Sequence, residues 1–307
     1  MDVGPGESSR RDAGPRRIVR HGEVSAPPEV SVVIPARDVA ETIDAQLDAL
    51  ECQTFTGPFE VVLVDNGSTD DTVACALRHD LDLRVVRATD RSGVAYARNV
   101  GIAAARADMV LVCDGDDVVS EHWVASMVDA LSHDAVVGGP VELEMLNTPA
   151  LAASRGRNDM STPLRRGSVA MLPGCNFGLR RELVDRVGPF DEHFDGLEDH
   201  EYALRLHAAG VPIGFAPDAV VHYRFRTATR DLVRQGFFYG RSHPLLARRA
   251  EELGAPTPPR FEWKGWAWLV VYLPLLFRAE QRCRWFWVAA NRWGRVVGSV
   301  GVRKIWL

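Results

Sequence analysis

Three aspartates at the end of an apolar run are the residues of this sequence best suited to chemistry. Residues 109–113, Met-Val-Leu-Val-Cys, are followed by Asp114, Gly115, Asp116 and Asp117. The apolar run predicts a buried parallel strand, and ligands of open α/β sheets bind outside the carboxyl ends of the strands. The carboxylates are therefore expected at a ligand site, where Mg²⁺ or Mn²⁺ would relieve their mutual repulsion.

The same residues also fit a structural role. Asp114 and Asp116 have the form of an Asx turn, and Asp116 or Asp117 can cap a helix that begins near Ser120. These residues alone leave the metal site and the turn as two open explanations.

A second acid follows another apolar run. Residues 60–64, Glu-Val-Val-Leu-Val, predict a buried strand with Asp65 at its carboxyl end. Residues 66–72 then form a turn into a helix, since Gly67 permits a tight turn and Ser68, Thr69 or Asp70 can cap the helix. Turn chemistry does not explain Asp65, whose carboxylate can accept hydrogen bonds from a nucleobase imide or a ribose.

Other polar residues have both a functional and a structural explanation. Arg98 lies in an alanine-rich helix predicted over residues 93–105, where it either pairs with phosphate or is exposed. Glu198 and Asp199 begin a predicted helix, a place where capping and the helix dipole already favour acids. His222 ends a short strand, where a lone histidine is more often structural than a ligand.

The elements that must position these residues alternate along the chain. Strands are predicted over residues 30–35, 60–64, 83–86 and 109–113, each followed by a helix. This βαβα order predicts an α/β fold, with one Rossmann-like, mostly parallel twisted sheet flanked by helices. Further short strands are predicted over residues 135–143, 174–179, 212–215 and 219–222. The polar segment 147–168 is too long for a simple connection, and it predicts a mobile loop over the site.

Charge is unevenly distributed. From Arg260 to the end there are nine Lys or Arg and two Glu, so this segment carries about +7 and the rest of the chain about −12. The acidic body disfavours nucleic acid as a partner. Five scattered cysteines without a C-x-x-C pair indicate a reducing compartment and no zinc site.

The basic end of the chain also holds seven of the eight tryptophans. Its longest uncharged run, residues 265–277, has thirteen residues and contains Pro274, whereas a bilayer span needs roughly 20. Such a segment fits attachment to the surface of an anionic membrane, and it also fits a protein–protein interface.

The chain is expected to have three parts. Residues 1–28 are polar and rich in Gly, Pro and Arg, which predicts a disordered tail without a signal peptide. Residues 29–225 form the α/β domain, with a nucleotide-binding half over 29–117 and an acceptor half over 118–225. Residues 226–307 form a helical, Trp- and Arg-rich extension.

Taken in order, these motifs resemble the family 2 glycosyltransferases of the GT-A fold. The resemblance covers roughly residues 30–225, and its specificity comes from the ordered combination. The matching segments are residues 32–35, 64–70, 97–101, 114–117 and 198–199. One departure is visible, because many relatives have asparagine near the position of Asp38.

The resemblance implies roles for the matching positions and their neighbours. The implied nucleotide-binding residues are Pro35, Ala36, Asp38, Asp65, Asn66, Arg98, Asp114 and Gly115. Asp116 and His222 would hold Mg²⁺ or Mn²⁺, with Asp117 as an alternative ligand. The implied catalytic residues are Asp199, as general base, and Glu198. Gly174 and Asn176 are expected to bind the acceptor.

The expected function is inverting, metal-assisted transfer of a sugar from a UDP-, GDP- or dTDP-linked donor to an acceptor hydroxyl. The acceptor would be a glycan, a lipid-linked glycan or a small molecule. Two alternatives stay open: a non-catalytic nucleotide-sugar-binding or membrane-recruitment module, and a sugar nucleotidyltransferase. A nucleotidyltransferase would normally need a Gly-rich phosphate loop soon after the first strand, and residues 35–38 of this sequence do not supply one. The expected location is cytoplasmic, at the inner face of the membrane if the extension binds lipid.

Overall fold

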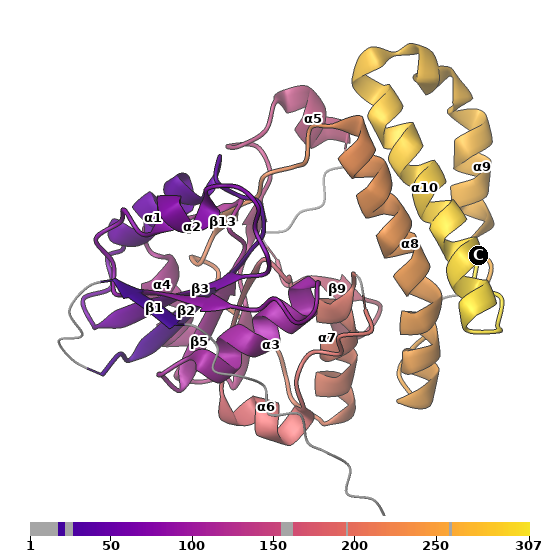
Figure 1. Ribbon diagram of the computed structural model, residues 1–307. Helices are drawn as coiled ribbons and strands as arrows, with labels where there is room; N and C mark the ends of the chain where they lie inside the picture. Colours follow the sequence, from indigo (N-terminus) through magenta and orange to yellow (C-terminus); the bar gives the residue numbers. More distant parts are fainter. Residues whose placement is uncertain (1–17, 22–26, 155–161, 195, 258–259) are drawn as a thin grey trace, which may run out of the picture.

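An eight-stranded sheet forms the centre of the computed structural model (Figure 1), which describes residues 18–21, 27–154, 162–194, 196–257 and 260–307. The middle strands β4, β3, β2 and β5 are parallel, whereas β11 pairs antiparallel with both β5 and β7. In sheet order the strands are β1 (Ile18–His21), β4 (Leu83–Arg87), β3 (Phe59–Asp65), β2 (Val30–Ala36), β5 (Met109–Cys113), β11 (Asn176–Arg180), β7 (Val136–Gly138) and β12 (Gly214–Phe215). The predicted mostly parallel α/β sheet is confirmed.

Helices cover both faces of this sheet, which is why its strands are apolar throughout. On β2, Val33 packs into one hydrophobic cluster, whereas Val32 and Ile34 pack into the other, as the two-residue period of a strand requires. Figure 1 shows α1 and α2 on one side of the sheet and α3 and α6 on the other. The helices of the α/β body are α1 (Ile43–Glu51), α2 (Thr72–Ala76), α3 (Val94–Ala104), α4 (Trp123–Leu131), α6 (Glu182–Val187) and α7 (Glu198–Ala208).

The strand predicted over residues 135–143 is divided between two sheets. β7 belongs to the central sheet, whereas β8 (Val141–Glu142) joins a small sheet with β6 (Val118–Val119) and β13 (Val221–His222). Gly139 separates β7 from β8, and a Cβ at Gly139 would lie 2.3 Å from the carbonyl oxygen of Ala219. The chain can therefore turn here only because this position lacks a side chain.

Two predicted irregular segments contain regular structure. Ile18–His21 pairs antiparallel with β4 as an edge strand, inside the segment predicted to be disordered. Within the predicted mobile loop lie α5 (Pro149–Ser154) and β9 (Arg165–Arg166), and β9 pairs with β10 (Val169–Ala170), which directly follows the loop. Residues 1–17, 22–26 and 155–161 of the two segments lie outside the described residues.

The C-terminal extension is helical, as expected. It consists of α8 (Thr229–Glu252), α9 (Trp263–Val271), the 3₁₀ helix η1 (Leu273–Phe277) and α10 (Ala279–Gly301). Figure 1 shows α8, in orange, between the α/β body and the yellow α10. Among the described helices, none combines the length and apolar character needed to cross a bilayer.

Glycines bring α8 and α10 into backbone contact. A Cβ at Gly236 or Gly240 of α8 would lie 2.6 or 2.0 Å from the carbonyl oxygen of Trp287 or Asn291. Two further glycines on α10, four residues apart, face α8 in the same way. The contacts advance together along both helices, so α8 and α10 run parallel. This close packing fixes α10 firmly to α8.

Candidate functional site

A cavity of about 580 Å³ lies between the carboxyl edge of the sheet and the C-terminal helices. Arg98, Asp114, Glu198 and Asp199 line it from the α/β body. The remaining lining residues are Val141, Leu143, Leu164, Pro173, Gly174, Cys175, Leu197, His200, Tyr223, Phe225, Leu232, Tyr239, Cys283, Arg284, Trp287 and Val288. A cavity of this size is typical of small-molecule sites.

The three aspartates after β5 form a compact group. Ligand atoms of Asp114, Asp116 and Asp117 all lie within 4.8 Å of one another. Asp117 is fully buried; its Oδ1 accepts a hydrogen bond from the backbone N–H of Arg224 at 2.8 Å, and its Oδ2 has no hydrogen-bond partner among the described residues. An orphaned buried carboxylate oxygen fits a site that a cation would complete.

The electrostatics of this group favour the same conclusion. Burial raises the pKa of Asp114 to about 6, although Arg98 opposes the shift. Burial also raises the pKa of Asp116, and burial together with the two neighbouring aspartates raises the pKa of Asp117 well above its usual range. A divalent cation would offset this desolvation and repulsion, so the residues present fit Mg²⁺ or Mn²⁺.

Arg98 joins the aspartate group to the acids of α7. Its Nη1 donates to Oε1 of Glu198 at 2.5 Å, and its Nη2 donates to the carbonyl oxygen of Gly174 at 2.8 Å and to Oδ1 of Asp114 at 3.4 Å. Arg98 is buried, so the exposed-arginine explanation is wrong. Burial raises the pKa of Glu198 to about 7 despite this pairing.

Asp199 faces the cavity beside Arg98 and is held by two backbone groups. Its Oδ2 accepts a hydrogen bond from Gly174 N–H at 2.9 Å, and its Oδ1 accepts one from His200 N–H at 2.8 Å. A Cβ at Gly174 would lie 2.8 Å from Oδ2 of Asp199, so only glycine permits this approach. Leu197, at the N-cap of α7, has φ of 64°, a left-handed conformation that side chains rarely adopt.

The predicted nucleotide-binding residues meet at the carboxyl ends of β2 and β3. Ala36 pairs in register with Asp65, and Pro35 precedes it on β2. Asp65 is buried and accepts hydrogen bonds from Ser68 N–H at 2.8 Å and from Arg87 Nη1 at 3.1 Å. These contacts hold its carboxylate in place.

Two neighbouring positions organise the loops at this edge. Asp38 has φ of 54°, and its Oδ1 accepts a hydrogen bond from Thr69 N–H at 2.7 Å. It does not cap α1, which begins at Ile43. Asn66 donates to the carbonyl oxygens of Ala88 and Arg91 and accepts from Gly93 N–H, so its amide is engaged in loop contacts.

Gly115 separates the aspartates and packs against the loop that precedes α1. A Cβ at this position would lie 3.3 Å from Val39 and 3.4 Å from Ile34 and Ile43. Its small size therefore lets the aspartate turn approach β2 closely.

Asn176 and His222 are two of the predicted site residues that do not line the cavity. Asn176 is buried; its Oδ1 accepts from Trp123 Nε1 at 2.8 Å, and its Nδ2 donates to the carbonyl oxygens of Pro140 and Ala219. Asn176 therefore lies in the core, and its expected acceptor contact stays a prediction. His222 pairs through Nδ1 with Oε2 of Glu142 at 2.8 Å and is not part of the aspartate group.

Sequence reasoning assigned no role to the arginines after β13. Nε of Arg224 donates to the backbone carbonyl of Asp116 at 2.9 Å, and the positive charges of Arg226 and Arg224 lower the pKa of Asp116 against the effect of burial. The alternation Tyr223-Arg224-Phe225-Arg226 was the available signal, because Tyr223 and Phe225 face the cavity.

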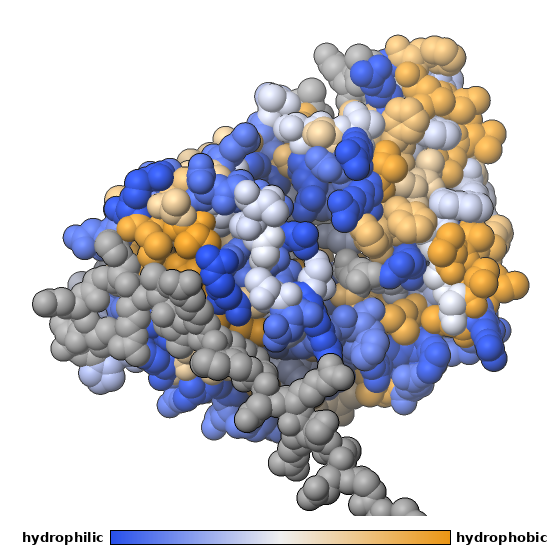
Figure 2. Space-filling view, viewed as in Figure 1, coloured by the Kyte–Doolittle hydropathy of each residue, from blue (hydrophilic) through white to orange (hydrophobic). Residues whose placement is uncertain are grey.

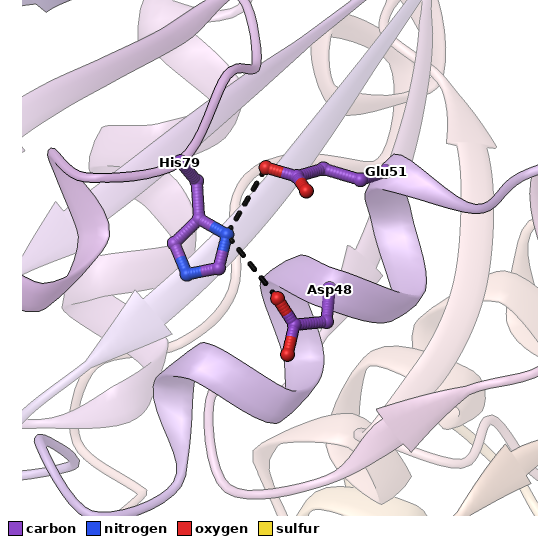
Figure 3. A group of neighbouring side chains, drawn as sticks. All are labelled: Asp48, Glu51 and His79. Atoms are coloured by element: carbon purple, nitrogen blue, oxygen red, sulfur yellow. Dashed lines mark hydrogen bonds and ion pairs between the residues drawn. The ribbon is translucent and has the colours of Figure 1, made fainter.

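Figure 3 shows a second group with metal-ligand chemistry, formed by Asp48 and Glu51 of α1 and by His79. Both carboxylates face Nδ1 of His79, at 3.6 Å for Asp48 and 3.1 Å for Glu51. Nε2 of His79 faces Asp44 at 3.1 Å. None of these four residues lines the large cavity. Because carboxylates of α1 face both ring nitrogens of His79, the imidazole can form ion pairs that link α1 to the segment after α2.

Comparison with known proteins agrees with this geometry. The family described as glycosyl transferase family 2 matches residues 31–188, which is half of the chain. The chain belongs to glycosyl transferase family 2. Its eight-stranded sheet is similar to that of solved GT-A glycosyltransferases. One is the mannosyltransferase PcManGT from Pyrobaculum calidifontis, in complex with GDP-Man and Mn²⁺, with a TM-score of 0.56, 22% identity, and coverage of 92% of this chain and 91% of that one. Another is S. aureus TarS 1-349, with a TM-score of 0.55, 18% identity, and coverage of 89% and 92%.

Curated members of the family are similar in sequence. The glycosyltransferase AglE of Haloferax volcanii is 31% identical over 202 residues, which cover 63% of this family 2 chain and 66% of AglE. The pre-mycofactocin glycosyltransferase of Mycobacterium tuberculosis is 29% identical over 243 residues, covering 74% of this chain and 49% of that protein. The chain thus spans about half to two thirds of the length of these relatives.

Proposed function

We propose that this protein is an inverting glycosyltransferase that moves a sugar from a nucleoside-diphosphate sugar to an acceptor hydroxyl with the help of Mg²⁺ or Mn²⁺. One observation carries the proposal: two separate acid groups meet at one cavity, with the buried Arg98 between them. The aspartates after β5 suit a cation and a diphosphate, and Asp199 suits proton transfer.

Asp199 is the best candidate for the general base. Its two backbone hydrogen bonds fix the carboxylate, and its remaining lone pairs can accept the proton of an acceptor hydroxyl in the cavity. Glu198 is less suited because its carboxylate is buried against Arg98. We assign Glu198 the task of positioning Arg98. General base catalysis is typically worth about 10²–10⁴-fold in rate.

Asp114, which lines the cavity, and Asp116 are the proposed metal ligands, and the orphaned Oδ2 of Asp117 belongs to the same group. A bound Mg²⁺ or Mn²⁺ would supply positive charge that stabilises a departing diphosphate. Arg224 and Arg226 add positive charge beside Asp116. Because Nδ1 of His222 pairs with Glu142, Nε2 is the nitrogen that we propose as a metal ligand.

The nucleoside is proposed to bind at the edge formed by Pro35, Ala36, Asp38 and Asp65. The chemistry of this edge, a fixed carboxylate beside backbone groups, suits a base and a ribose. UDP-, GDP- and dTDP-sugars all remain donors to be tested. The related folds include a protein in complex with GDP-Man and one in complex with UDP-GlcNAc.

Two variants, one isosteric and one truncating, test whether Asp199 acts as the base and the aspartates after β5 bind the metal. Asp199→Asn can still accept a hydrogen bond from only one of the N–H groups of Gly174 and His200. Because the proposed metal ligands are unchanged, it should bind donor and Mn²⁺ while losing transfer and donor hydrolysis. Asp116→Ala should lose Mn²⁺-dependent donor binding in calorimetry. Normal turnover by Asp199→Asn contradicts the base assignment. Donor binding by the wild-type chain without hydrolysis or transfer would favour a non-catalytic binding module.

We also propose that the C-terminal helices attach the protein to an anionic membrane surface. Of thirteen exposed large hydrophobic side chains among the described residues, twelve lie between Phe261 and Ile305. Figure 2 shows orange side chains gathered over the C-terminal helices, while the α/β body is mostly blue and white. Arg278 and Arg282 are exposed at the start of α10, beside Phe277, which is 90% exposed. Apolar side chains next to cations suit an anionic lipid interface.

Point variants test attachment better than truncation, because α10 packs against α8 through its backbone. Phe277→Glu and Val270→Glu should abolish co-sedimentation with phosphatidylcholine vesicles that contain phosphatidylglycerol. Met145→Glu changes a comparably exposed apolar residue of the α/β body and should sediment like wild type. If Phe277→Glu and Val270→Glu sediment with vesicles as Met145→Glu and wild type do, membrane attachment is contradicted. A protein–protein interface then explains the exposed apolar side chains.

A further inference from the structure

The cavity has two chemically different ends. The end formed by the α/β body carries Arg98, Asp114, Glu198 and Asp199. The rest of the lining, called the wall below, is mainly apolar and aromatic. Its members are Val141, Leu143, Leu164, Tyr223, Phe225, Leu232, Tyr239, Trp287 and Val288. A molecule that fills the cavity must therefore have one polar and one apolar end.

Two of the C-terminal helices build much of this apolar wall. Leu232 and Tyr239 come from α8, and Trp287 and Val288 come from α10. The glycine contacts described above hold α10 against α8, so the wall is fixed by backbone packing and not by side chains alone. The extension is therefore part of the site as well as the region proposed to bind membrane.

Few polar groups interrupt this wall. Tyr239 lies within 2.9 Å of the position that a Cβ on Gly196 would take, close to the start of α7. Burial and the nearby carboxylates of Asp199 and Glu198 raise its pKa, so its hydroxyl stays protonated. Arg284 is the cation that α10 contributes to the lining of the cavity. Its guanidinium also stacks on Trp268, 5.4 Å from the ring centroid.

The mainly apolar side chains of the wall argue against a free sugar or a polar glycan as its occupant. Each hydroxyl placed against Leu232, Val288 or Phe225 would lose its hydrogen bonds to water without replacement, which is unfavourable. An alkyl or aromatic group in the same place would instead be transferred out of water, which is favourable. The volume of about 580 Å³ admits a ligand of small-molecule size at most.

We propose that the acceptor is an amphiphile: a hydroxyl compound whose reacting oxygen lies at Asp199 and whose apolar or aromatic part packs on the wall formed by α8 and α10. The proposal rests on the proposed glycosyltransferase function, because it names the acceptor class of that site. It assigns Trp287, Val288 and Leu232 as residues that determine acceptor specificity. The hydroxyl of Tyr239 is placed to donate to a polar group near the junction of the two ends.

The first test uses the full-length wild-type chain and a graded set of probes. Binding of glucose, butyl glucoside, hexyl glucoside and octyl glucoside is measured by calorimetry below their micelle concentrations. Full burial of a methylene group is worth about fourfold in affinity. Octyl glucoside should therefore bind on the order of tenfold or more tightly than butyl glucoside. Equal binding of glucose and octyl glucoside overturns the proposal.

The second test locates the apolar part. Val288→Trp fills the cavity from α10, whereas Val297→Trp makes the same change on the same helix at an exposed position. Octyl glucoside binding should fall on the order of tenfold in Val288→Trp and stay unchanged in Val297→Trp. A reversed pattern means that the alkyl chain binds the outer face of α10, which overturns the assignment.

Two controls keep the result decisive. Binding of UDP-, GDP- and dTDP-glucose with Mn²⁺ is measured on the same samples; its absence in wild type refutes the proposed function, whereas its presence without chain-length dependence refutes only the acceptor class. If Val288→Trp does not fold, Val288→Thr replaces it. This near-isosteric change adds a hydroxyl to the wall and should weaken octyl glucoside binding more than Val297→Thr does.

Discussion

Replacing Arg98 by methionine should destabilise the protein in a manner that depends strongly on pH. Arg98 is 2% exposed and pairs with Glu198, which is itself 5% exposed, and with Asp114. Methionine keeps much of the volume and removes the charge. The variant therefore leaves two acids buried without their cation.

The magnitude follows from the protonation of Glu198. With Arg98 present, burial already raises the pKa of Glu198 from 4.5 to about 7, and removal of the arginine raises it further. At pH 8.5 the variant must either bury an unpaired carboxylate or bind a proton, and breaking a buried pair typically costs about 3–5 kcal/mol. At pH 5.5 Glu198 is protonated in both proteins, so the loss should fall to about 1–2 kcal/mol from the missing hydrogen bonds.

The direction of this pH dependence follows from proton linkage. An acid whose folded-state pKa is raised stabilises the fold at low pH, and this stabilisation disappears as the pH rises through the folded value. Raising the pKa of Glu198 further therefore makes Arg98→Met progressively worse above pH 7, not below it. The free energy of unfolding is measured in urea at pH 5.5 and 8.5.

A matched surface variant serves as control. Arg248 pairs with Glu252 on the exposed face of α8, and Arg248→Met should cost at most about 1 kcal/mol at either pH. An equal loss for Arg98→Met at both pH values, or a loss as small as that of Arg248→Met, would refute the buried-pair argument.

Three further predictions concern the metal and the base. Mn²⁺ should raise the melting temperature of wild type more at pH 8 than at pH 5, because protons compete for Asp114 below its pKa of about 6; an equal shift at both pH values contradicts this site. Asp117→Asn should weaken Mn²⁺ binding in calorimetry on the order of tenfold while Asp48→Asn leaves it unchanged, since Asp48 lies in the group around His79. Gly174→Ala should lower kcat by on the order of tenfold or more and leave donor affinity intact, because a methyl group would displace the carboxylate of Asp199; an unchanged kcat counts against a fixed base.

The central sheet could be predicted because its signal is local. β2, β3 and β5 are covered on both faces, so each is a continuous apolar run that a reader of the sequence can find. The acids at their ends were equally visible, since a carboxylate directly after such a run has few structural explanations. Positions whose role depends on partners far along the chain were less accessible.

Asn176 shows why part of the site could not be predicted. It was expected to bind the acceptor, but its three hydrogen-bond partners come from α4, from the residue before β8 and from the segment before β13. Nothing near residue 176 in the sequence signals these partners. Arg98 is a similar case, because nothing in its alanine-rich helix signals that it is buried and pairs with Glu198, 100 residues later.

The C-terminal helices were predicted as helices but not as part of the site. Their signal was the pair of glycines four residues apart on each helix, Gly236 with Gly240 and Gly294 with Gly298. Small residues at this spacing allow two backbones to touch, in water as in membranes. The two glycine pairs therefore predict that one face of the Trp-rich segment packs along α8, so that only its other faces can contact lipid.

Helix α10 connects the two proposals made for this extension. Cys283, Arg284, Trp287 and Val288 follow the helical spacing of one face and line the cavity, whereas Trp293, 62% exposed, and Val300, 76% exposed, point outward. The outer face of this helix would contact the lipid surface that holds an amphiphilic acceptor. The wall that Val288 forms lies on the other side of the same helix, one helix diameter away. Membrane attachment and acceptor choice then depend on opposite sides of a single helix. Val297→Trp and Val288→Trp should therefore separate them: the first leaves acceptor binding unchanged, and the second leaves vesicle binding unchanged.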